Sequence, residues 1–428
     1  MRTTPAPDTS ADVIIIGGGL AGLSAADGLR DSDLRVTLLE SADRLGGRTY
    51  GQHWDAADRA VDMGGTWLLP SFAQTFALLS ELGISTVESP DVVHWLTHFR
   101  TGPAVQRELT TTQLGELTAA LDSFAAITEA ATEPLTAEAV FQAAAATDRA
   151  PSPLIEDWQR AMQRYLAGAP LDAVDAGHLL LDVADIADPE HYHTQVSGTT
   201  QALVDALSAR VTATVALGTR VTAVRHDRGE FRVETADGGV YSAARVIVAA
   251  PLNCLADIEF DDKLLGSFAP LLADGHAGAS HKDWLVIDGI PAHFRVFASH
   301  GPYGYFRSEA ILADGGTLCV GLTPSAELPL LTEALEQTIR EHYFPGATIR
   351  ARLSHDWNAD PHARGTWFVP RPGQYAALPE LTTGHPQLWI VGGDVDAAFP
   401  GMIEGAVLSG QRAAAAIHQP PAAERATR

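Results

Sequence analysis

The first apolar run of the chain occupies residues 11–17, ADVIIIG, and is rich in β-branched residues. A short continuous run of this kind is typical of a strand buried on both faces. A cluster of glycines ends it, and residues 20–30 then place apolar side chains at helical spacing. A second apolar run at 34–39 ends in Glu40. The order strand, glycine turn, helix, strand predicts the opening of a doubly wound parallel sheet.

The pattern changes twice further along the chain. Residues 106–180 are alanine-rich and punctuated by leucine, which predicts helices packed on each other. Within them, the alanines at 143–146 are interpreted as part of an ordinary helix, because Thr136 offers a capping start. Later apolar and alternating runs predict strands at 220–225, 230–235, 245–249, 284–287, 304–307, 317–321 and 388–391, followed by a helix at 402–417.

Composition narrows the class of protein. The 428 residues are 46% hydrophobic and 19% charged, which is ordinary for a globular protein of two or three domains. The formal net charge of −24 makes nucleic acid and anionic membrane surfaces poor partners. The same charge gives a weak long-range attraction for a cationic small molecule.

The cysteines and the N-terminal residues indicate where in the cell the protein is expected. Cys254 and Cys319 lie far apart in the sequence, so a disulfide framework or a cysteine-ligated metal is not expected. The first ten residues contain no apolar signal segment, and no apolar run reaches the length of a membrane helix. We therefore expect a cytoplasmic monomer or homodimer that does not enter a membrane.

The glycine turn has the spacing of a dinucleotide-binding fingerprint. Its residues are Gly17, Gly18, Gly19, Leu20, Ala21 and Gly22. In such a fingerprint the first glycine makes the tight turn, the second admits a pyrophosphate and the third lets helix pack on strand. The pyrophosphate would bind at the helix N-terminus, and Glu40 would bind ribose hydroxyls. Strand, helix and acidic partner together predict a dinucleotide site.

A basic segment follows Glu40 directly. It contains Arg44, Gly46, Gly47 and Arg48, which offer backbone donors and positive charge for phosphate. No second fingerprint follows, so no separate nicotinamide domain is expected. If the bound dinucleotide carries out redox chemistry, its electrons must come from the substrate.

At this point the sequence resembles the flavin amine oxidase family of monoamine and polyamine oxidases. Besides the fingerprint, the resemblance rests on residues 45–49, 62–67, 198–207, 220–221, 246–251, 365–367, 392–394 and 401–406. It implies an α/β protein with a discontinuous, Rossmann-like FAD-binding domain and an inserted α+β substrate-binding domain. The FAD-binding domain would take residues 1–75, 196–256 and 386–428, and the substrate domain residues 76–195 and 257–385.

The resemblance also implies roles for matching positions. Glu40 would hold the adenosine ribose, and the Val221 backbone would meet the adenine. Arg44, Gly47 and Arg48 would line the phosphate and ribityl path, with Gly393 and Asp394 in the ribityl-phosphate region. The isoalloxazine would be bordered by Gly64, Gly65, Thr66 and Trp67 and by Gly401, Met402 and Ile403.

Three departures from the family pattern alter these expectations. Thr366 stands where monoamine oxidases carry the cysteine that links the flavin, so we expect noncovalent FAD. Trp367 and Met402 stand where those enzymes place two tyrosines around the substrate; the alternative is that both belong to the core beneath the flavin. Leu68 replaces the arginine with which many amino-acid oxidases of the group bind a carboxylate, although another arginine could take that role.

Four residues are candidates for the catalytic site: Lys282, Trp367, Met402 and Gln201. The resemblance places Lys282 near flavin N5, where its ammonium would stabilise the superoxide formed from O₂; the alternative is a solvated strand-edge lysine paired with Asp283. Gln201 resembles a pocket glutamine, with a surface helix position as its alternative. His191 and His193 have no partners at metal spacing, so no metal site is expected.

The function that follows is an FAD-dependent oxidase of an amine or a related C–N compound, with hydride transfer to the flavin and reoxidation by O₂. Two alternatives keep the same cofactor. One is a desaturase of a small biosynthetic intermediate, and the other is a redox-neutral flavin isomerase or mutase. Reduction of the flavin by an amine under anaerobic conditions would separate the first from the others.

Overall fold

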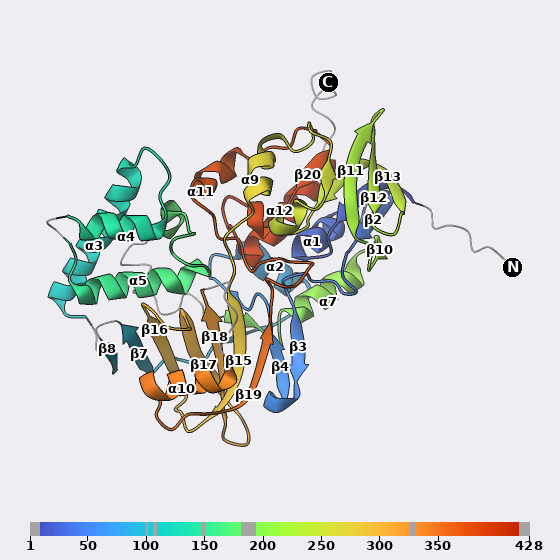
Figure 1. Cartoon of the computed structure of the whole chain (residues 1–428). Helices are drawn as coiled ribbons and strands as arrows, with labels where there is room; N and C mark the ends of the chain where they lie inside the picture. The colour runs from blue at the N-terminus through green and yellow to red at the C-terminus, as the bar shows by residue number, and fades with distance from the viewer. Residues whose placement is uncertain are drawn as a thin grey trace.

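The computed structural model describes residues 9–99, 102–105, 109–147, 150–180, 194–324 and 331–418. Two large sheets and a group of helices surround the middle of the molecule (Figure 1). The strand order of the first sheet is β10-β2-β1-β13-β12-β11-β14, with β20 also paired to β13. That of the second sheet is β19-β15-β18-β17-β16-β7-β8. The fold is therefore mixed α/β.

The centre of the first sheet is parallel and assembles strands from distant parts of the sequence. Its strands are β1 (Ser10–Ile16), β2 (Val36–Leu39), β10 (Thr214–Ala216), β11 (Val221–Asp227), β12 (Glu230–Thr235), β13 (Val240–Val248), β14 (Glu259–Phe260) and β20 (Leu388–Ile390). Ile16 of β1 is in register with Leu39 on one side and Val248 on the other. The predicted opening of a parallel sheet is confirmed, and its strands are buried on both faces.

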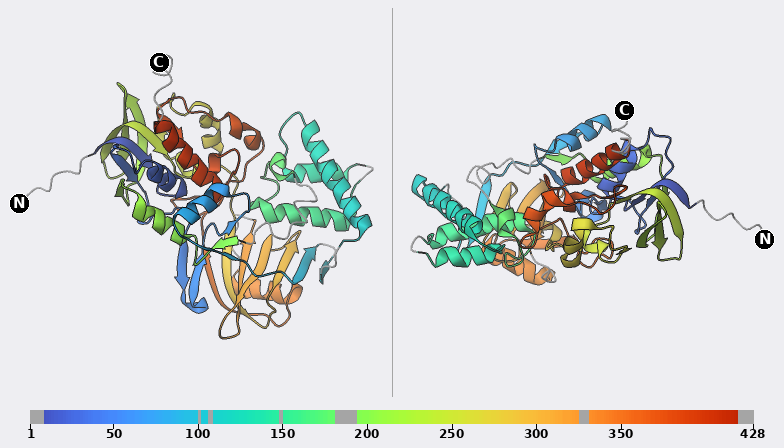
Figure 2. Two further views of the ribbon diagram at one scale, coloured as in Figure 1. Left: turned by 180° about the vertical axis from the view of Figure 1, so that it is seen from behind. Right: turned by 90° about the horizontal axis from the view of Figure 1, so that it is seen from above.

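Helices cover this sheet because their own apolar faces need a partner. They are α1 (Leu20–Gly28), α2 (Ala73–Glu81), α7 (Gln201–Arg210) and α12 (Ile403–His418). Helices α1 and α12 lie side by side (Figure 2). Gly410 permits this approach, since a Cβ there would overlap the carbonyl oxygen of Ala21. The first and last helices of the fold thus share one core with β1.

The second sheet is mostly antiparallel. It contains β7 (His94–Phe99), β8 (Gly102–Val105), β15 (His281–Asp288), β16 (Phe294–Ala298), β17 (Tyr305–Ile311), β18 (Thr317–Thr323) and β19 (Thr348–His355). Helix α10 (Thr332–His342) packs Leu335 and Ile339 on one face of it, against Leu285 and Ile287. The other face carries Trp284 and its neighbours toward the middle of the molecule.

Three helices stand on the side away from the first sheet (Figures 1 and 2). They are α3 (Thr111–Ala130), α4 (Ala137–Ala145) and α5 (Pro153–Ala167). The Thr136 hydroxyl caps α4 by accepting a hydrogen bond from the Ala139 N–H at 3.1 Å, as predicted. Thr110 and Gln113 form a full capping box at the start of α3, which the sequence analysis did not identify. The predicted group of packed helices is therefore present.

Several short strands and helices were not predicted from the apolar pattern. They are β3 (Gly51–Trp54), β4 (Arg59–Asp62), β5 (Trp67–Leu68), β6 (Thr86–Glu88), β9 (Thr194–Val196), α8 (Leu252–Leu255), α9 (Ala269–Asp274) and α11 (Gln374–Ala377). Strands of two to four residues leave too few positions for an alternation to be recognised. None of the described helices is both long enough and apolar enough to cross a membrane.

The structure also bears on the expected boundary at residue 256. Strand β14 joins the first sheet beyond it, and Leu264, Phe268 and Leu271 pack into the core of that sheet. The second sheet draws on both segments assigned to the substrate domain, because β7 pairs with β16. The division of the chain into two domains remains a prediction.

Candidate functional site

One cavity of about 1020 Å³ extends from the glycine turn to the face of the second sheet that carries Trp284. It is lined by almost all the residues predicted for a cofactor or a substrate. These are Gly17, Gly19, Leu20, Ala21, Glu40, Arg44, Gly46, Gly47, Arg48, Gly64, Gly65, Thr66, Trp67, Val221, Lys282, Trp367, Gly393, Asp394, Gly401, Met402 and Ile403. Gly22 and Gln201 are not part of the lining.

The glycine turn lies at the N-terminus of α1 and lines the cavity. Helix α1 begins at Leu20 directly after Gly19, which has no side chain to cap the first turn. Leu20 and Ala21, in the first turn of α1, line the cavity, and the N-terminus of a helix suits an anion. Gly17 has φ of +105°, and a Cβ there would lie 2.8 Å from the Ala249 backbone. A Cβ at Gly22 would overlap the Gly17 carbonyl, so the third glycine serves helix packing, as predicted.

Glu40 is held by backbone donors at the end of β2. Its Oε2 accepts a hydrogen bond from the Gly18 N–H at 2.6 Å, and its Oε1 accepts one from the Ala42 N–H at 2.7 Å. The side chain is buried and lines the cavity beside the glycine turn. A carboxylate fixed in this way is an acceptor in a set position, as the ribose role requires.

Arg44 lines the cavity and fixes the backbone of the basic segment. Its Nη1 donates to the Gly47 carbonyl at 3.0 Å, and its guanidinium lies 4.1 Å from the centre of the Tyr50 ring. Gly46 contacts the turn directly, because its N–H donates to the Gly18 carbonyl at 2.9 Å. The glycine turn and the basic segment, both predicted to contact phosphate, therefore form one surface.

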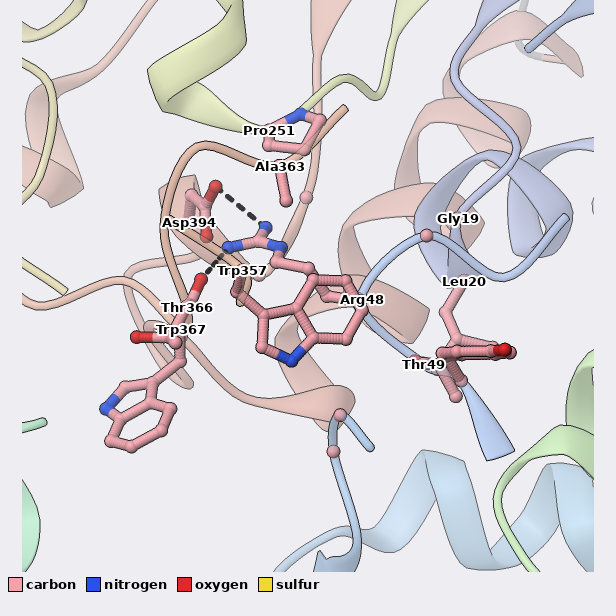
Figure 3. A pocket seen from close by; sticks show the side chains of 18 of the residues that line it. Gly19, Leu20, Arg48, Thr49, Pro251, Trp357, Ala363, Thr366, Trp367 and Asp394 are labelled. Carbon is pink, nitrogen blue, oxygen red and sulfur yellow. Dashed lines mark hydrogen bonds and ion pairs between the residues drawn. The ribbon is translucent and has the colours of Figure 1, made fainter. Parts of the chain in front are cut away.

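The partly exposed Arg48 forms an ion pair with the buried Asp394 in the cavity wall (Figure 3). Arg48 donates to Asp394 Oδ2 at 2.8 Å and to the Thr366 carbonyl at 2.5 Å. The Leu252 N–H donates to the same Oδ2 at 2.9 Å. Burial acts to raise the pKa of Asp394, but the Arg48 charge, His276 and the hydrogen bonds from Leu252 and Arg48 together hold the pKa below its ordinary value. Asp394 Oδ1 is buried and has no hydrogen-bond partner in the described chain.

Lys282 is buried inside β15 and faces the cavity. Its Nζ donates to the Gly64 carbonyl at 3.0 Å and to the Thr66 hydroxyl, and it lies 5.0 Å from the Trp67 ring centre. The alternative of a solvated lysine paired with Asp283 is wrong. Asp283 is instead paired with Arg352, which lies on the neighbouring strand β19 and donates two hydrogen bonds to it, each 2.9 Å long.

The electrostatics around Lys282 involve one buried acid. Burial lowers the pKa of Lys282 to about 8, although the nearby Asp62 acts to raise it. Burial raises the pKa of Asp62 to about 6, against the opposing effects of Lys282 and of hydrogen bonds from Thr200. The Thr200 N–H and hydroxyl donate to Asp62 Oδ1 at 3.0 and 2.6 Å. Lys282 is therefore mostly protonated at pH 7 and loses its proton as the pH rises through about 8.

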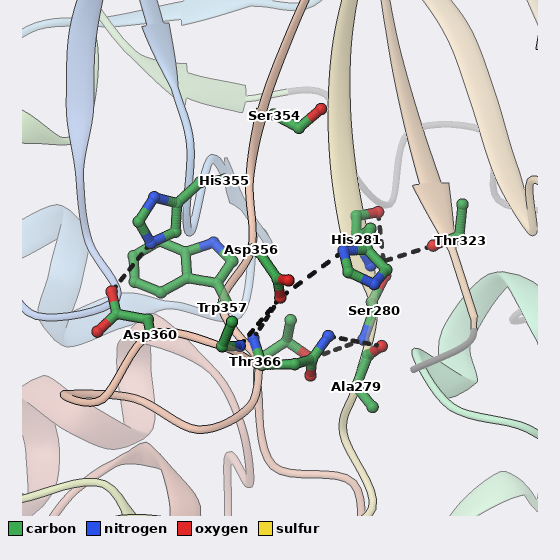
Figure 4. Close-up of polar contacts among 12 residues, drawn as sticks. Ala279, Ser280, His281, Thr323, Ser354, His355, Asp356, Trp357, Asp360 and Thr366 are labelled. Carbon is green, nitrogen blue, oxygen red and sulfur yellow. Dashed lines mark hydrogen bonds and ion pairs between the residues drawn. The ribbon is translucent and has the colours of Figure 1, made fainter. Parts of the chain in front are cut away.

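Trp367 and Met402 both line the cavity, and both also contact neighbouring apolar clusters. The Trp367 ring packs over Gly168 at the end of α5, where a Cβ would overlap it. Thr366, just before it, is tied to the second sheet because its hydroxyl accepts from the Ser280 N–H at 3.3 Å (Figure 4). The pair therefore lines the cavity and also packs on the core, and its place beside the substrate stays a prediction.

Gln201 is placed elsewhere, which corrects the interpretation as a pocket residue. It starts α7, where its Oε1 accepts from the Gly51 N–H at 3.4 Å and its Nε2 donates to Asp205 at 2.9 Å. The preceding residue, Thr200, turns inward to Asp62, and one step along a helix rotates the next side chain away. The surface position is the one found.

His191 and His193 lie outside the described residues. Within those residues, no group of three or more His, Cys, Asp or Glu side chains is arranged to hold a metal ion.

Several residues of the wall were missed by the sequence analysis. Tyr305 lies with its ring centre 5.2 Å from that of Trp67 and 5.1 Å from that of Tyr165. Arg295, on the neighbouring strand β16, and His178 also line this end. The alternation of residues within β16 and β17 could have predicted that Arg295 and Tyr305 lie on strands. Nothing local shows that residues so far apart in sequence share a cavity.

Comparison with known proteins agrees with this arrangement. A family model described as flavin containing amine oxidoreductase matches residues 20–418. (S)-6-hydroxynicotine oxidase of Paenarthrobacter nicotinovorans is 27% identical over 435 residues, covering 95% of this chain and 99% of that protein. Pseudooxynicotine dehydrogenase of a Pseudomonas species is 25% identical over 425 residues, covering 94% of this chain and 84% of that protein.

Solved structures share the fold along nearly the whole chain. A double mutant of putrescine oxidase superposes with a TM-score of 0.80 at 20% identity, covering 96% of this chain and 100% of that one. Cyclohexylamine oxidase from Brevibacterium oxydans gives 0.79 at 20% identity, covering 99% and 100%. With its glycine turn, Glu40 and a family match that runs from α1 to α12, this chain belongs to the flavin containing amine oxidoreductase family.

Proposed function

We propose that the protein is an FAD-dependent oxidase of a small amine, with the FAD bound noncovalently and O₂ as the electron acceptor. The observation that carries the proposal is the continuity of the cavity. Its wall runs from the glycine turn and Glu40, past the Arg48–Asp394 pair, to Lys282 and Trp367. A long dinucleotide bound along it would have its reactive end among the residues of the second sheet.

The residues present fit FAD. The N–H groups after Gly19 suit the diphosphate, and the fixed Glu40 carboxylate suits ribose hydroxyls. Asp394 Oδ1, buried without a partner in the described chain, would accept from a hydroxyl of the cofactor. Val221 would border the adenine. We also propose the division into an FAD-binding and a substrate domain, because the two sheets draw on the expected segments apart from residues just after 256.

The mode of attachment follows from Thr366. A threonine hydroxyl does not form the thioether that a cysteine provides, and here it accepts a hydrogen bond from the Ser280 N–H. Denaturation with acid or heat should therefore release intact FAD into the supernatant. Flavin that stays with the precipitated protein would contradict noncovalent binding.

The residues near Lys282 would orient the substrate and shield it from water. When bound, FAD supplies the acceptor for a hydride equivalent from the amine carbon and returns the electrons to O₂. Trp367 and Met402 would hold the amine beside the flavin, and an aromatic plane with a flexible thioether would fit a wider or flatter substrate than two facing tyrosines do. The buried Lys282 ammonium would stabilise negative charge that develops on O₂.

The test is anaerobic mixing of the yellow protein with a panel of amines. An oxidase of amines bleaches the flavin absorbance, and admitting air then restores the colour and yields peroxide in amounts equal to the substrate consumed. A desaturase would instead be reduced by a non-amine substrate. A redox-neutral isomerase would turn over without net peroxide. Failure of every amine to reduce the flavin would overturn the proposal.

A further inference from the structure

His178 lies in the wall of the cavity, in the part that Trp367 also lines. It belongs to the short 3-10 helix η2 (Ala176–Leu179). Its neighbour Leu179 is buried in an apolar cluster against which Leu166 and Trp367 pack. These three residues line the cavity together with His178. The histidine is therefore a polar side chain within an apolar part of the wall.

One aspartate fixes the position of this histidine. Asp175 Oδ1 accepts a hydrogen bond from the Gly177 N–H at 2.7 Å, and the Asp175 carbonyl accepts one from the His178 N–H at 3.2 Å. Asp175 Oδ2 accepts from the Gly373 N–H at 2.6 Å, directly before α11. Helix α11 carries Tyr375, whose ring centre is 5.3 Å from that of His178 in an edge-on contact. Asp175 thus holds both His178 and the aromatic ring that it packs against.

The ring nitrogens of His178 have no partner in the described chain, which distinguishes it from the other histidines of the described cavity wall. These are His355 and His362. His355 pairs with an aspartate at 2.9 Å, and His362 contacts a serine hydroxyl at 2.8 Å. The His178 ring packs edge-on against Tyr375 and forms no hydrogen bond or ion pair within the described residues. Its side chain keeps accessible surface, so both nitrogens are available to a ligand.

His178 is uncharged at neutral pH. Burial lowers its pKa to about 4, so at pH 7 one ring nitrogen carries a hydrogen and the other does not. The ring can then donate one hydrogen bond and accept another. A hydroxyl group matches it, because a hydroxyl also does both. An ammonium would leave the ring N–H unused, and a carboxylate would meet a donor without the positive charge that strengthens its binding.

From its place in the fold, His178 would meet a part of the substrate remote from the reacting C–N bond. Helix η2 packs on α3, α4, α5 and α11. None of these four helices carries a residue predicted to bind FAD. The residues predicted to border the isoalloxazine are 64–67 and 401–403, and Lys282 lies on β15. The helical group, rather than the elements that would hold the cofactor, therefore positions His178.

We propose that His178 binds a hydroxyl group of the amine substrate, remote from the carbon that is oxidised, an inference that rests on the proposed amine oxidation. The rings of Trp67, Tyr165 and Tyr305 also line the cavity and contact one another, which favours a flat carbon skeleton. The substrate class is therefore an aromatic amine that carries a phenol or alcohol group. A neutral imidazole would also not repel the ammonium form of the amine as it enters.

Binding of amines that cannot be oxidised tests the site without catalysis. The probes are the phenethyltrimethylammonium ion and its 3-hydroxy and 4-hydroxy derivatives. Their quaternary nitrogen has no electron pair to support loss of a hydride, and they differ by one phenol hydroxyl. Calorimetry with the FAD-loaded protein should show at least one derivative binding about three- to tenfold more tightly than the parent ion, as one net hydrogen bond predicts. If neither derivative binds more tightly, the proposal is overturned.

Variants separate a hydrogen bond from a mere effect of shape. His178→Leu should remove the preference for the hydroxylated probe, and His178→Gln, which keeps a donor and an acceptor, should retain part of it. An equal loss of affinity for all three probes in His178→Leu would contradict the proposal.

A second histidine in a ring contact provides the control. His226 of β11 is half-buried, packs on His385 with ring centres 4.2 Å apart and does not line the described cavity. His226→Leu should leave the preference unchanged. FAD content and melting temperature of each variant show whether it has folded. If His178→Leu does not fold, the wild-type comparison and His178→Gln still decide the matter.

Kinetics separate failure of this inference from failure of the proposed function. The substrates are 2-phenylethylamine and its 3-hydroxy and 4-hydroxy derivatives, compared by kcat/KM. We expect a preference for one hydroxylated amine of about three- to tenfold, expressed mainly in KM and lost in His178→Leu. Oxidation of all three amines without preference would overturn the hydroxyl site and leave amine oxidation standing. Selective binding of a hydroxylated probe, without flavin reduction by any amine, would overturn amine oxidation and keep the site.

Discussion

At the end near the glycine turn the cavity wall consists largely of backbone, whereas at the end near Tyr305 it consists of side chains. Much of the first end is built from residues that follow one another within the first 48 positions, with Glu40 held by the N–H groups of Gly18 and Ala42. Val221 and the segment from Ala249 to Pro251 complete it. The second end takes Trp67, Tyr165, Lys282 and Tyr305 from four separate elements.

The difference follows from what each end would bind. A dinucleotide has a constant diphosphate, which backbone N–H groups at a helix N-terminus recognise whatever the neighbouring side chains are. A substrate is recognised by shape and charge, which only side chains provide. Substitutions at the first end should therefore act on cofactor content, and substitutions at the second end on rates and selectivity.

The sharpest test of this contrast lies within the glycine turn itself. Gly19→Val should give a folded protein without FAD, because φ at Gly19 is −73° and a Cβ there approaches nothing closer than the Gly46 carbonyl at 3.9 Å. Gly22→Ala should instead destabilise folding, since its Cβ overlaps the Gly17 carbonyl. FAD per protein and melting temperature distinguish the two. Full flavin occupancy in Gly19→Val would remove this turn from the binding site.

Glu40→Ala should also yield mostly apo protein. The substitution leaves the Gly18 and Ala42 N–H groups and the ribose hydroxyls without their acceptor, at about 1–3 kcal/mol for each unpaired buried group. Titration of the apo protein with FAD, followed by fluorescence, measures the loss of affinity. Glu40→Gln keeps an acceptor oxygen and should lose less. Unchanged affinity in Glu40→Ala would contradict the ribose role.

At the other end of the cavity, Trp367→Ala should impair turnover far more than folding. We expect kcat/KM to fall about 100-fold because the substrate loses its orienting wall. Trp367 is only half-buried, so the free energy of unfolding should fall by less than the about 3–5 kcal/mol of a fully buried tryptophan. Parallel losses of activity and stability would instead assign the ring to the core.

Lys282→Met should separate the two halves of the reaction. It keeps length and packing and removes the charge beside Thr66 and Trp67. Reduction of the flavin by substrate should persist, while reoxidation by O₂ slows tenfold or more, as loss of about 1.4 kcal/mol of transition-state stabilisation predicts. Stopped-flow absorbance measures both steps. Unchanged reoxidation in fully flavinated Lys282→Met would exclude this role for the lysine.

The smallest expected effect is a pH dependence of reoxidation. The pKa of Lys282 in the folded protein is about 8, below its ordinary 10.5, so the ammonium is lost as pH rises through 8. Reoxidation should therefore slow above pH 8 in the wild type and stay flat in Lys282→Met. Between these two pKa values the unfolded chain binds more protons, so the lysine should make the free energy of unfolding rise with pH. A wild-type profile that stays flat to pH 10 would contradict the assignment.

Much of this protein was determined by its sequence alone, because the decisive features are local. The turn at residues 17–22 and Glu40 at the end of the next strand lie within one short segment, and the predicted opening of the first sheet is confirmed. The expectation at Thr366 depends only on which residue type stands there. Few residues other than glycine fit the backbone geometry of such a turn, so the glycine pattern is enough to predict the turn.

Only the tertiary structure decided the other end of the cavity. Gln201 was misplaced because one residue along a helix decides between the inside and the surface, and Thr200 occupies the inward position. Lys282 has a neighbouring acid in sequence but a different set of partners in space, since strand pairing brings Arg352 to Asp283. Tyr305 meets Trp67 of β5 and Arg295 of β16 only when these strands pack together. Long-range packing of side chains makes these contacts, and no local pattern encodes it.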